Sequence, residues 1–371
     1  MSRKGKYKVH VFFGFGRGWV CGLVLFFVSF CPGSVGAFAP HAPLPGLEQA
    51  VEHLCGEVLK GQDPDPARIA SIIAHVRAQG DASQSLPRYA DAPGAYLGFQ
   101  IRMPMQRLLR YLYNPEIPQE LIKPFSIRSS DWTTPGSAED QRRLWTDPWP
   151  ASNVVVVRGE QYDRTTADLS TGGCYGMSLK RALIFVPHEM ALLSVSVQTG
   201  PSEVGTKGYL LGHDEGSRYV YSGEEGLTRA GLGWVSSRIL TNVSIGVYLG
   251  QGEAVQSGVF QWMRAGWSGM SVVKESHIKD SLTRYRERIG AVLHAPGLPA
   301  PEELEQLFRT LDGKSDADLR HDAEPLLAAY LEQARQDNNK AAIRILEDGY
   351  AERLDRGELI GLLMRERLIA P

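Results

Sequence analysis

Hydrophobic residues recur at helical spacing in the first part of the chain. From Leu47 to Leu59 the apolar positions lie three or four residues apart, so they share one face of a helix. A second helix is predicted after Asp65, because aspartate is a favourable N-cap, Pro66 suits the first helical position and the apolar stripe ends at Gly80.

The stretch that follows is poorer in regular patterns. Residues 81–95 are predicted to be a loop, and residues 104–113 form a third apolar helical segment. Prolines recur through residues 115–150, and because proline lacks a backbone N–H and restricts φ, long regular elements are not expected there. Residues 38–150 are therefore predicted to be a helical region with a Pro-rich connection.

The pattern changes between residues 151 and 270, where the apolar runs become short and β-branched. Leu193, Val195 and Val197 alternate with polar residues, which gives a strand one buried and one polar face, and residues 243–249 alternate in the same way. Glycine-containing turns separate these runs closely and leave little room for crossover helices. We therefore predict an antiparallel β region, arranged as a sandwich or a barrel.

Residues 271–371 return to helical spacing, most clearly from Ile278 to Leu293. This part of the chain contains interspersed basic and acidic residues, which is typical of a solvated helical surface. The predicted fold class is thus α+β, with a central antiparallel β region flanked by N-terminal and C-terminal helical regions.

The first 37 residues have the pattern of a secretory signal peptide. They contain basic residues and no acidic residue, followed by a short uncharged apolar run over residues 18–30 and then by small residues. Cleavage after Ala37 would place Val35 and Ala37 at the two small-residue positions. A retained anchor is the alternative, although the run is shorter than the about 20 residues that a membrane span needs. Either version predicts a periplasmic or extracellular protein that touches the membrane only through this segment.

Removing residues 1–37 changes the charge of the chain. The 371 residues carry a formal net charge of −2, with 40 basic and 42 acidic residues. Every acidic residue follows residue 37, so the mature chain is more acidic than the whole. This balance provides no basic surface for nucleic acid, and the ordinary composition excludes disordered and disulfide-dense classes. The expected partner is a protein or a cell-envelope component.

Two cysteines follow the predicted signal peptide, Cys55 and Cys174. In an oxidising compartment they are a candidate disulfide. A pair of free thiols is the alternative, because Cys55 lies on the apolar face of the first predicted helix and is suited to burial.

Cys174 is also a candidate nucleophile, because its glycine neighbours would expose the sulfur. The surrounding string, STGGCYGM, resembles the S-H-G-C-x-R-M signature of the L,D-transpeptidases, which cross-link bacterial cell walls. Gly172 and Gly176 stand where that family has histidine and arginine. The resemblance implies cysteine chemistry at Cys174 with an upstream base, but no histidine lies between His75 and Cys174. His188, which follows Cys174 in the chain, is the candidate base if folding brings it close. A cell-envelope cysteine hydrolase or transpeptidase is therefore the alternative function.

Aromatic residues of the β region provide the other candidate site. Tyr219, Tyr221 and Trp234 would bind a ligand by stacking if they faced outward, whereas core packing is the alternative. The string that begins at His188 starts like the zinc motif H-E-x-x-H, but Leu192 replaces the second histidine. No metal and no other cofactor is predicted. The favoured function is a non-enzymatic envelope or partner-binding protein.

Overall fold

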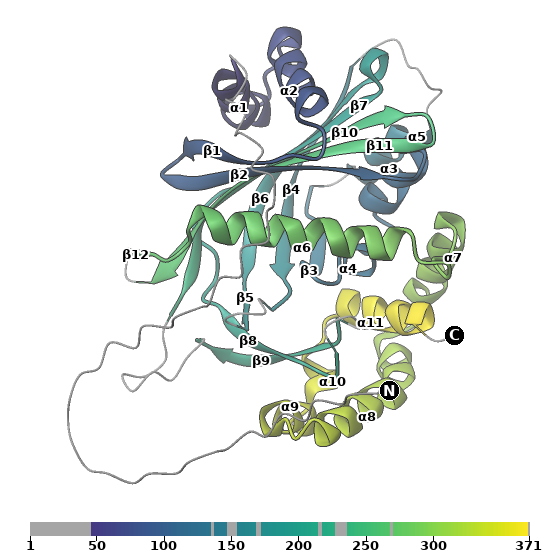
Figure 1. Cartoon of the computed structure of the whole chain (residues 1–371). Helices are drawn as coiled ribbons and strands as arrows, with labels where there is room; N and C mark the ends of the chain where they lie inside the picture. The colour runs from purple at the N-terminus through teal and green to yellow at the C-terminus, as the bar shows by residue number, and fades with distance from the viewer. Residues whose placement is uncertain are drawn as a thin grey trace, which may run out of the picture. The chain divides into compact units, whose positions relative to one another are not determined.

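The computed structural model describes residues 46–134, 137–146, 154–167, 172–213, 217–226, 236–267 and 270–369. All of them belong to one compact unit, His41–Pro371. The predicted signal peptide and Trp234 lie outside the described residues. The α+β class is confirmed, because helices flank a large antiparallel sheet in this unit (Figure 1).

Two helices precede the sheet, as the spacing predicted. Helix α1 spans Leu47–Gly56, the short 3-10 helix η1 spans Val58–Lys60 and α2 spans Pro66–Gln79. The N-cap prediction is also confirmed, because the Asp65 side chain accepts a hydrogen bond from the Ala67 N–H at 2.8 Å.

The main sheet has nine strands in the order β1-β2-β11-β10-β7-β6-β4-β3, with β12 paired to β11. Their bounds are β1 Ser83–Tyr89, β2 Ala92–Ile101, β3 Ile127–Trp132, β4 Val155–Thr165, β6 Gly176–Val186, β7 Ala191–Gln198, β10 Arg238–Gln251, β11 Ala254–Trp267 and β12 Met270–Ser271. A separate small sheet has the order β5-β8-β9, with β5 at Gly173–Cys174, β8 at Thr206–Leu210 and β9 at Tyr219–Glu225.

The prediction of a loop over residues 81–95 is wrong, because a hairpin of β1 and β2 occupies this part of the chain. Ala90 and Asp91 form its turn with positive φ values of 46° and 59°. Tight hairpins of this kind usually carry glycine or asparagine at such positions, so the turn lacks its usual sequence signal. Strand β3 likewise lies within the Pro-rich connection, between its prolines.

The two faces of the main sheet pack against different helices. Ile184 and Val195 belong to the hydrophobic cluster that contains the apolar faces of α1 and α2. Leu183 and Leu192 point the other way, into the cluster that includes α6 (Glu275–Leu293). This alternation is the period of two that the sequence showed in β7. Figure 1 shows α6 lying across its face of the sheet.

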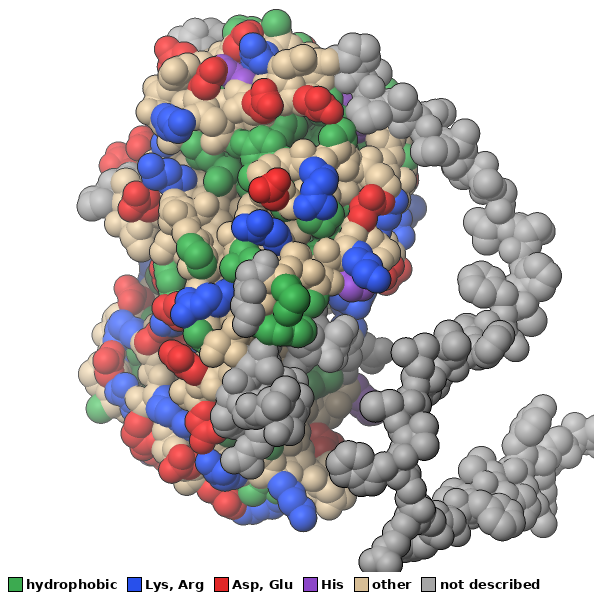
Figure 2. Space-filling view, turned by 90° about the vertical axis from the view of Figure 1, so that its left-hand side faces the viewer, with side chains coloured by type: hydrophobic (Ala, Val, Ile, Leu, Met, Phe, Trp, Pro, Cys, Tyr) green, Lys and Arg blue, Asp and Glu red, His purple; other side chains and the backbone are tan. Residues whose placement is uncertain are grey.

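The remaining helices complete the second cluster. Before the β region these are α3 Met105–Tyr113, α4 Gln119–Ile122 and α5 Ser137–Thr146, and a short 3-10 helix, η2 Pro187–Glu189, joins β6 to β7. After α6 come α7 Pro301–Asp312, α8 Asp316–Gln336, α9 Lys340–Glu347, α10 Tyr350–Arg353 and α11 Arg356–Ile369. Figure 2 shows basic and acidic side chains interspersed on the C-terminal helices, in the lower half of the view.

Helix α11 packs against α4 and β3, which joins the C-terminal helices to the sheet. Glu120 of α4 lies in this contact with its side chain buried, directly against Gly361 of α11. Burial raises the pKa of the Glu120 carboxyl to about 8.

Replacing Glu120 with glutamine is expected to make stability less sensitive to pH. The folded protein keeps this carboxyl protonated up to about pH 8, whereas it ionises near its ordinary pKa of 4.5 when unfolded. Stability is therefore present below the unfolded pKa and falls as pH rises toward 8, by at most about 1.4 kcal/mol per pH unit. In urea unfolding at pH 5, 6 and 7, the free energy of unfolding of Glu120→Gln should increase relative to that of the wild type as pH rises. Glu253→Gln, in an exposed turn, is the control. If the stability of Glu120→Gln and that of the wild type changed equally with pH, the raised pKa of Glu120 would be contradicted.

Candidate functional site

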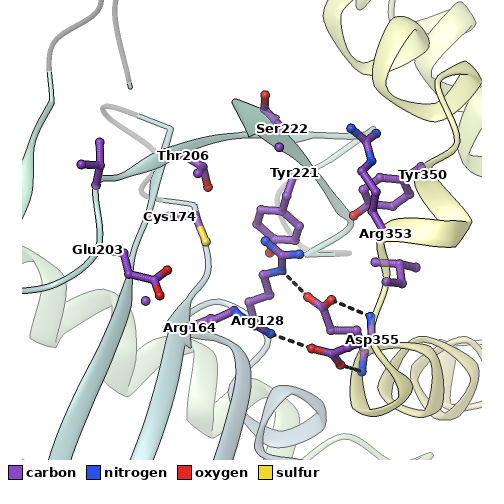
Figure 3. Close-up of a pocket in the computed structure, with 15 residues that line it drawn as sticks. Arg128, Arg164, Cys174, Glu203, Thr206, Tyr221, Ser222, Tyr350, Arg353 and Asp355 are labelled. Carbon is purple, nitrogen blue, oxygen red and sulfur yellow. Dashed lines mark hydrogen bonds and ion pairs between the residues drawn. The ribbon is translucent and has the colours of Figure 1, made fainter. Parts of the chain in front are cut away.

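A cavity of about 280 Å³ lies between the small sheet, the ends of β3 and β4, and helices α10 and α11 (Figure 3). Its lining comes from segments that are far apart in the chain. The described lining residues are Arg128, Arg164, Cys174, Gly176, Glu203, Val204, Thr206, Tyr221, Ser222, Gly223, Tyr350, Arg353, Leu354, Asp355 and Glu358.

Arg128 of β3 is held rigidly at one wall of this cavity. Its Nε donates to Glu358 Oε1 at 2.5 Å, and its guanidinium lies over the Tyr221 ring, 4.0 Å from the ring centroid. Burial is the largest single influence and acts to lower the pKa of the Arg128 guanidinium, but the surrounding groups, the Glu358 carboxylate foremost, together outweigh it and the pKa is raised overall. Arg128 therefore stays cationic inside the protein.

Arg164 of β4 lies beside it and binds the second carboxylate. Its Nη1 donates to Asp355 Oδ2 at 2.7 Å. Asp355 and Glu358 also satisfy each other's backbone, because Asp355 Oδ1 accepts from the Glu358 N–H at 2.9 Å and Glu358 Oε2 accepts from the Asp355 N–H at 3.2 Å. This reciprocal pair is a capping box at the start of α11. The fold of the helix end thus places both carboxylates against the two arginines.

The glycine at position 176 allows two side chains to approach the backbone closely at the cavity wall. A Cβ at Gly176 would overlap the Tyr162 hydroxyl and come within 2.6 Å of Glu203 Oε2. Glu203 is anchored through its backbone N–H, which donates to the Gly176 carbonyl at 2.8 Å. Figure 3 shows the Glu203 carboxylate on the side of the cavity that faces Arg128 and Arg164.

Cys174 lies in the cavity wall as a buried thiol rather than as an activated nucleophile. Its Sγ donates to the Thr165 carbonyl at 2.8 Å. Burial raises the pKa of the thiol, although Arg128 opposes this. A thiol with a raised pKa contains little thiolate near pH 7, and the thiolate is the reactive form.

The pairing of Cys174 with His188 is wrong. Cys174 precedes β6 and His188 follows it, and a strand of 11 residues extends about 35 Å. His188 is also exposed, in the 3-10 turn between β6 and β7. The two residues therefore lie beyond opposite ends of β6, and the continuous strand keeps them apart.

The candidate disulfide is not formed either, since Cys55 and Cys174 are both free. Cys55 packs from α1 into the cluster on one face of the main sheet, whereas Cys174 belongs to the small sheet. Burial raises the pKa of the Cys55 thiol to about 12. The alternative of buried free thiols is therefore what the structure contains.

Neither Cys55 nor Cys174 is expected to react with iodoacetamide in the native protein at pH 8, because both thiols are buried and protonated. Peptide mass spectrometry should find both alkylated only after unfolding in guanidinium chloride. Rapid labelling of Cys174 in the folded chain, at a rate near that of a free thiol, would show that it is accessible and reactive.

Tyr221 is the predicted binding aromatic that reaches the cavity. It stacks on Tyr219 with ring centroids 6.2 Å apart, and its hydroxyl lies 3.1 Å from Thr166 Oγ1. Tyr219 is itself buried, and Trp234 lies outside the described residues. Of the residues singled out from the sequence, the cavity thus brings together Cys174 and Tyr221.

The charged residues of the cavity were missed because isolated charges usually indicate solvated surface. One signal was available: Asp355 and Glu358 are spaced as a capping box just before an apolar run. Nothing local marked Arg128 or Arg164. Among the described residues, no three His, Cys, Asp or Glu side chains are placed to hold a metal ion.

Comparison with known proteins leaves the family open. No family model matches the chain, and no curated protein matches it. The lipid transfer and protein localization domain of human StarD13 (DLC2) is similar at 9% identity and a TM-score of 0.30, over 61% of this chain and 96% of that one. The protein TTHA0849 from Thermus thermophilus is similar at 11% identity and a TM-score of 0.26, over 60% and 100%. At these TM-scores neither likeness bears on function. Each described helix is too short or too polar to span a membrane.

Proposed function

We propose that this chain is an exported, non-enzymatic binding protein and that it binds a small polar ligand in the cavity beside Arg128. The observation that carries the proposal is the gathering of charged side chains from distant segments around one open volume. Burying charge costs free energy even when the charges are paired, so such a cluster contributes little to stability and is better suited to recognition.

The size of the cavity supports a small ligand. A volume of about 280 Å³ equals that of roughly nine water molecules in the liquid and lies at the lower limit of typical ligand pockets. A metabolite or a fragment of an envelope polymer fits this volume, whereas a folded partner does not.

The state of Cys174 supports binding over catalysis. Its thiol is buried and hydrogen-bonded to a backbone carbonyl, and its predicted base lies at the far end of β6. Export rests on the sequence pattern of residues 1–37, and the expected mature N-terminus is Phe38. Mass spectrometry of the intact protein from the exported fraction tests this, and recovery of the full chain in the cytoplasm would contradict it.

Screening a panel of small polar compounds by thermal shift tests the binding proposal, with calorimetry to measure the affinity of each compound that raises Tm. A ligand that binds only the folded state stabilises it, by an amount that grows with the ratio of ligand concentration to Kd. Thr206→Tyr should abolish binding, because the Thr206 side chain lines the cavity beside Cys174 in Figure 3 and a ring there would fill it. Thr310→Tyr on the exposed side of α7 is the matched control. Unchanged affinity in Thr206→Tyr would place the binding elsewhere.

A further inference from the structure

We infer that the ligand of this cavity is a small zwitterion of the amino-acid type, with its ammonium group against Glu203 and its carboxylate against Arg164. This inference rests on the proposed function and names the class of ligand. Three observations carry it: the balance of charge in the lining, the donors that the arginines retain, and the position of the Glu203 carboxylate near Arg164.

The described lining is balanced in charge. It contains three arginines and three carboxylates, namely Arg128, Arg164, Arg353, Glu203, Asp355 and Glu358. A ligand with a net negative charge would approach all three carboxylates, and a cation would approach all three arginines. A zwitterion adds no net charge, and each of its charged groups meets an opposite one, which compensates for its loss of hydration.

The arginines have hydrogen-bond donors to offer. A guanidinium has five N–H donors in a rigid planar fork that matches a carboxylate. Asp355 accepts from Nη1 of Arg164, and Glu358 accepts from Nε of Arg128. Because one carboxylate uses only part of this fork, Arg164 can bind a second carboxylate while Asp355 holds the side chain in place.

Glu203 is the carboxylate suited to an ammonium group. Asp355 and Glu358 are each engaged by an arginine and by the backbone of α11, whereas Glu203, in the connection between β7 and β8, hydrogen-bonds with the Tyr162 hydroxyl, which is a neutral group. In Figure 3 its carboxylate points toward the side of the cavity where Arg128 and Arg164 lie, and the Cys174 thiol lies above it in the view. A ligand in the cavity would therefore meet an anion and a cation close together.

The test compares matched trios of probes by calorimetry on the full mature chain. The trios are alanine with ethylamine and propionate, valine with isobutylamine and isovalerate, and γ-aminobutyrate with propylamine and butyrate. In at least one trio the zwitterion should bind at least tenfold more tightly than its amine and its acid. Glu203→Gln should weaken the zwitterion about tenfold and leave the acid unchanged, and Arg164→Gln should weaken both. Glu253→Gln, in an exposed turn, should change neither.

Three results separate this inference from the proposed function. An acid that binds as tightly as its zwitterion would overturn the inference and show an anion site, with the proposed function intact. Binding of other polar compounds, sensitive to Thr206→Tyr, without binding of any zwitterion in the trios would have the same effect. No binding in either the trios or the wider panel would overturn both.

Discussion

Replacing Glu358 with alanine is expected to lower the free energy of unfolding by about 3–5 kcal/mol. Glu358 and Arg128 form an ion pair in which the side chains are only 7% and 17% exposed, respectively. The change would leave the Arg128 guanidinium desolvated and without its carboxylate, and it would also remove half of the capping box of α11. Urea denaturation at pH 7, with the change in midpoint at constant slope, measures the loss.

Two further variants show whether burial is the cause. Glu347→Ala breaks an ion pair with Arg335 in which both side chains are 52% exposed, and it should cost no more than about 1 kcal/mol. The double variant Arg128→Met with Glu358→Leu removes both charges and should recover much of the stability. A loss below about 1 kcal/mol in Glu358→Ala would mean that water reaches this pair.

Replacing Gly98 with alanine is expected to destabilise the protein by about 3 kcal/mol or more, because overpacking against backbone cannot be relieved by a rotamer change. Gly98 of β2 pairs with Gly258 of β11, and its N–H donates to the Ala82 carbonyl at 2.9 Å. A Cβ at this position would overlap the carbonyl oxygen of Gly80 at the end of α2. The chain after α2 and the strand β2 would have to separate.

Gly290→Ala is the matched control for this change. Gly290 lies within α6, and a Cβ there meets nothing within 4 Å. The substitution should stabilise the helix by up to about 1 kcal/mol, because alanine has the higher helix propensity. The Tm and the urea midpoint should fall in Gly98→Ala and rise in Gly290→Ala. Equal changes in stability in the two variants would mean that the contact between Gly98 and the Gly80 carbonyl does not constrain the fold.

The sequence predicted those elements whose signal is local. Apolar spacing placed α1, α2 and α6, and Asp65 marked the start of α2. Alternation placed β7, because a strand with two different faces repeats every second residue. The β1–β2 hairpin was not predicted, because Ala90 and Asp91 occupy the turn positions where glycine or asparagine is usual.

The cavity could be anticipated only in part. Cys174 and Tyr221 stood out by residue type and neighbours, and both line it. The sequence could not predict their roles, because the exposure and the pKa of a side chain depend on the groups that the rest of the chain places around it. Cys174 and His188 are 14 positions apart in the chain, yet a straight strand separates them in space.

By itself, then, the sequence determined the α+β class, the helical ends and the antiparallel β region, since backbone periodicity and capping are local properties. It also determined the acidic balance of the chain after residue 37. Only the tertiary structure decided that Arg128 and Arg164 meet Glu358 and Asp355 around an open cavity. These partners are up to 230 positions apart, and their meeting follows from the docking of α11 on β3 and α4.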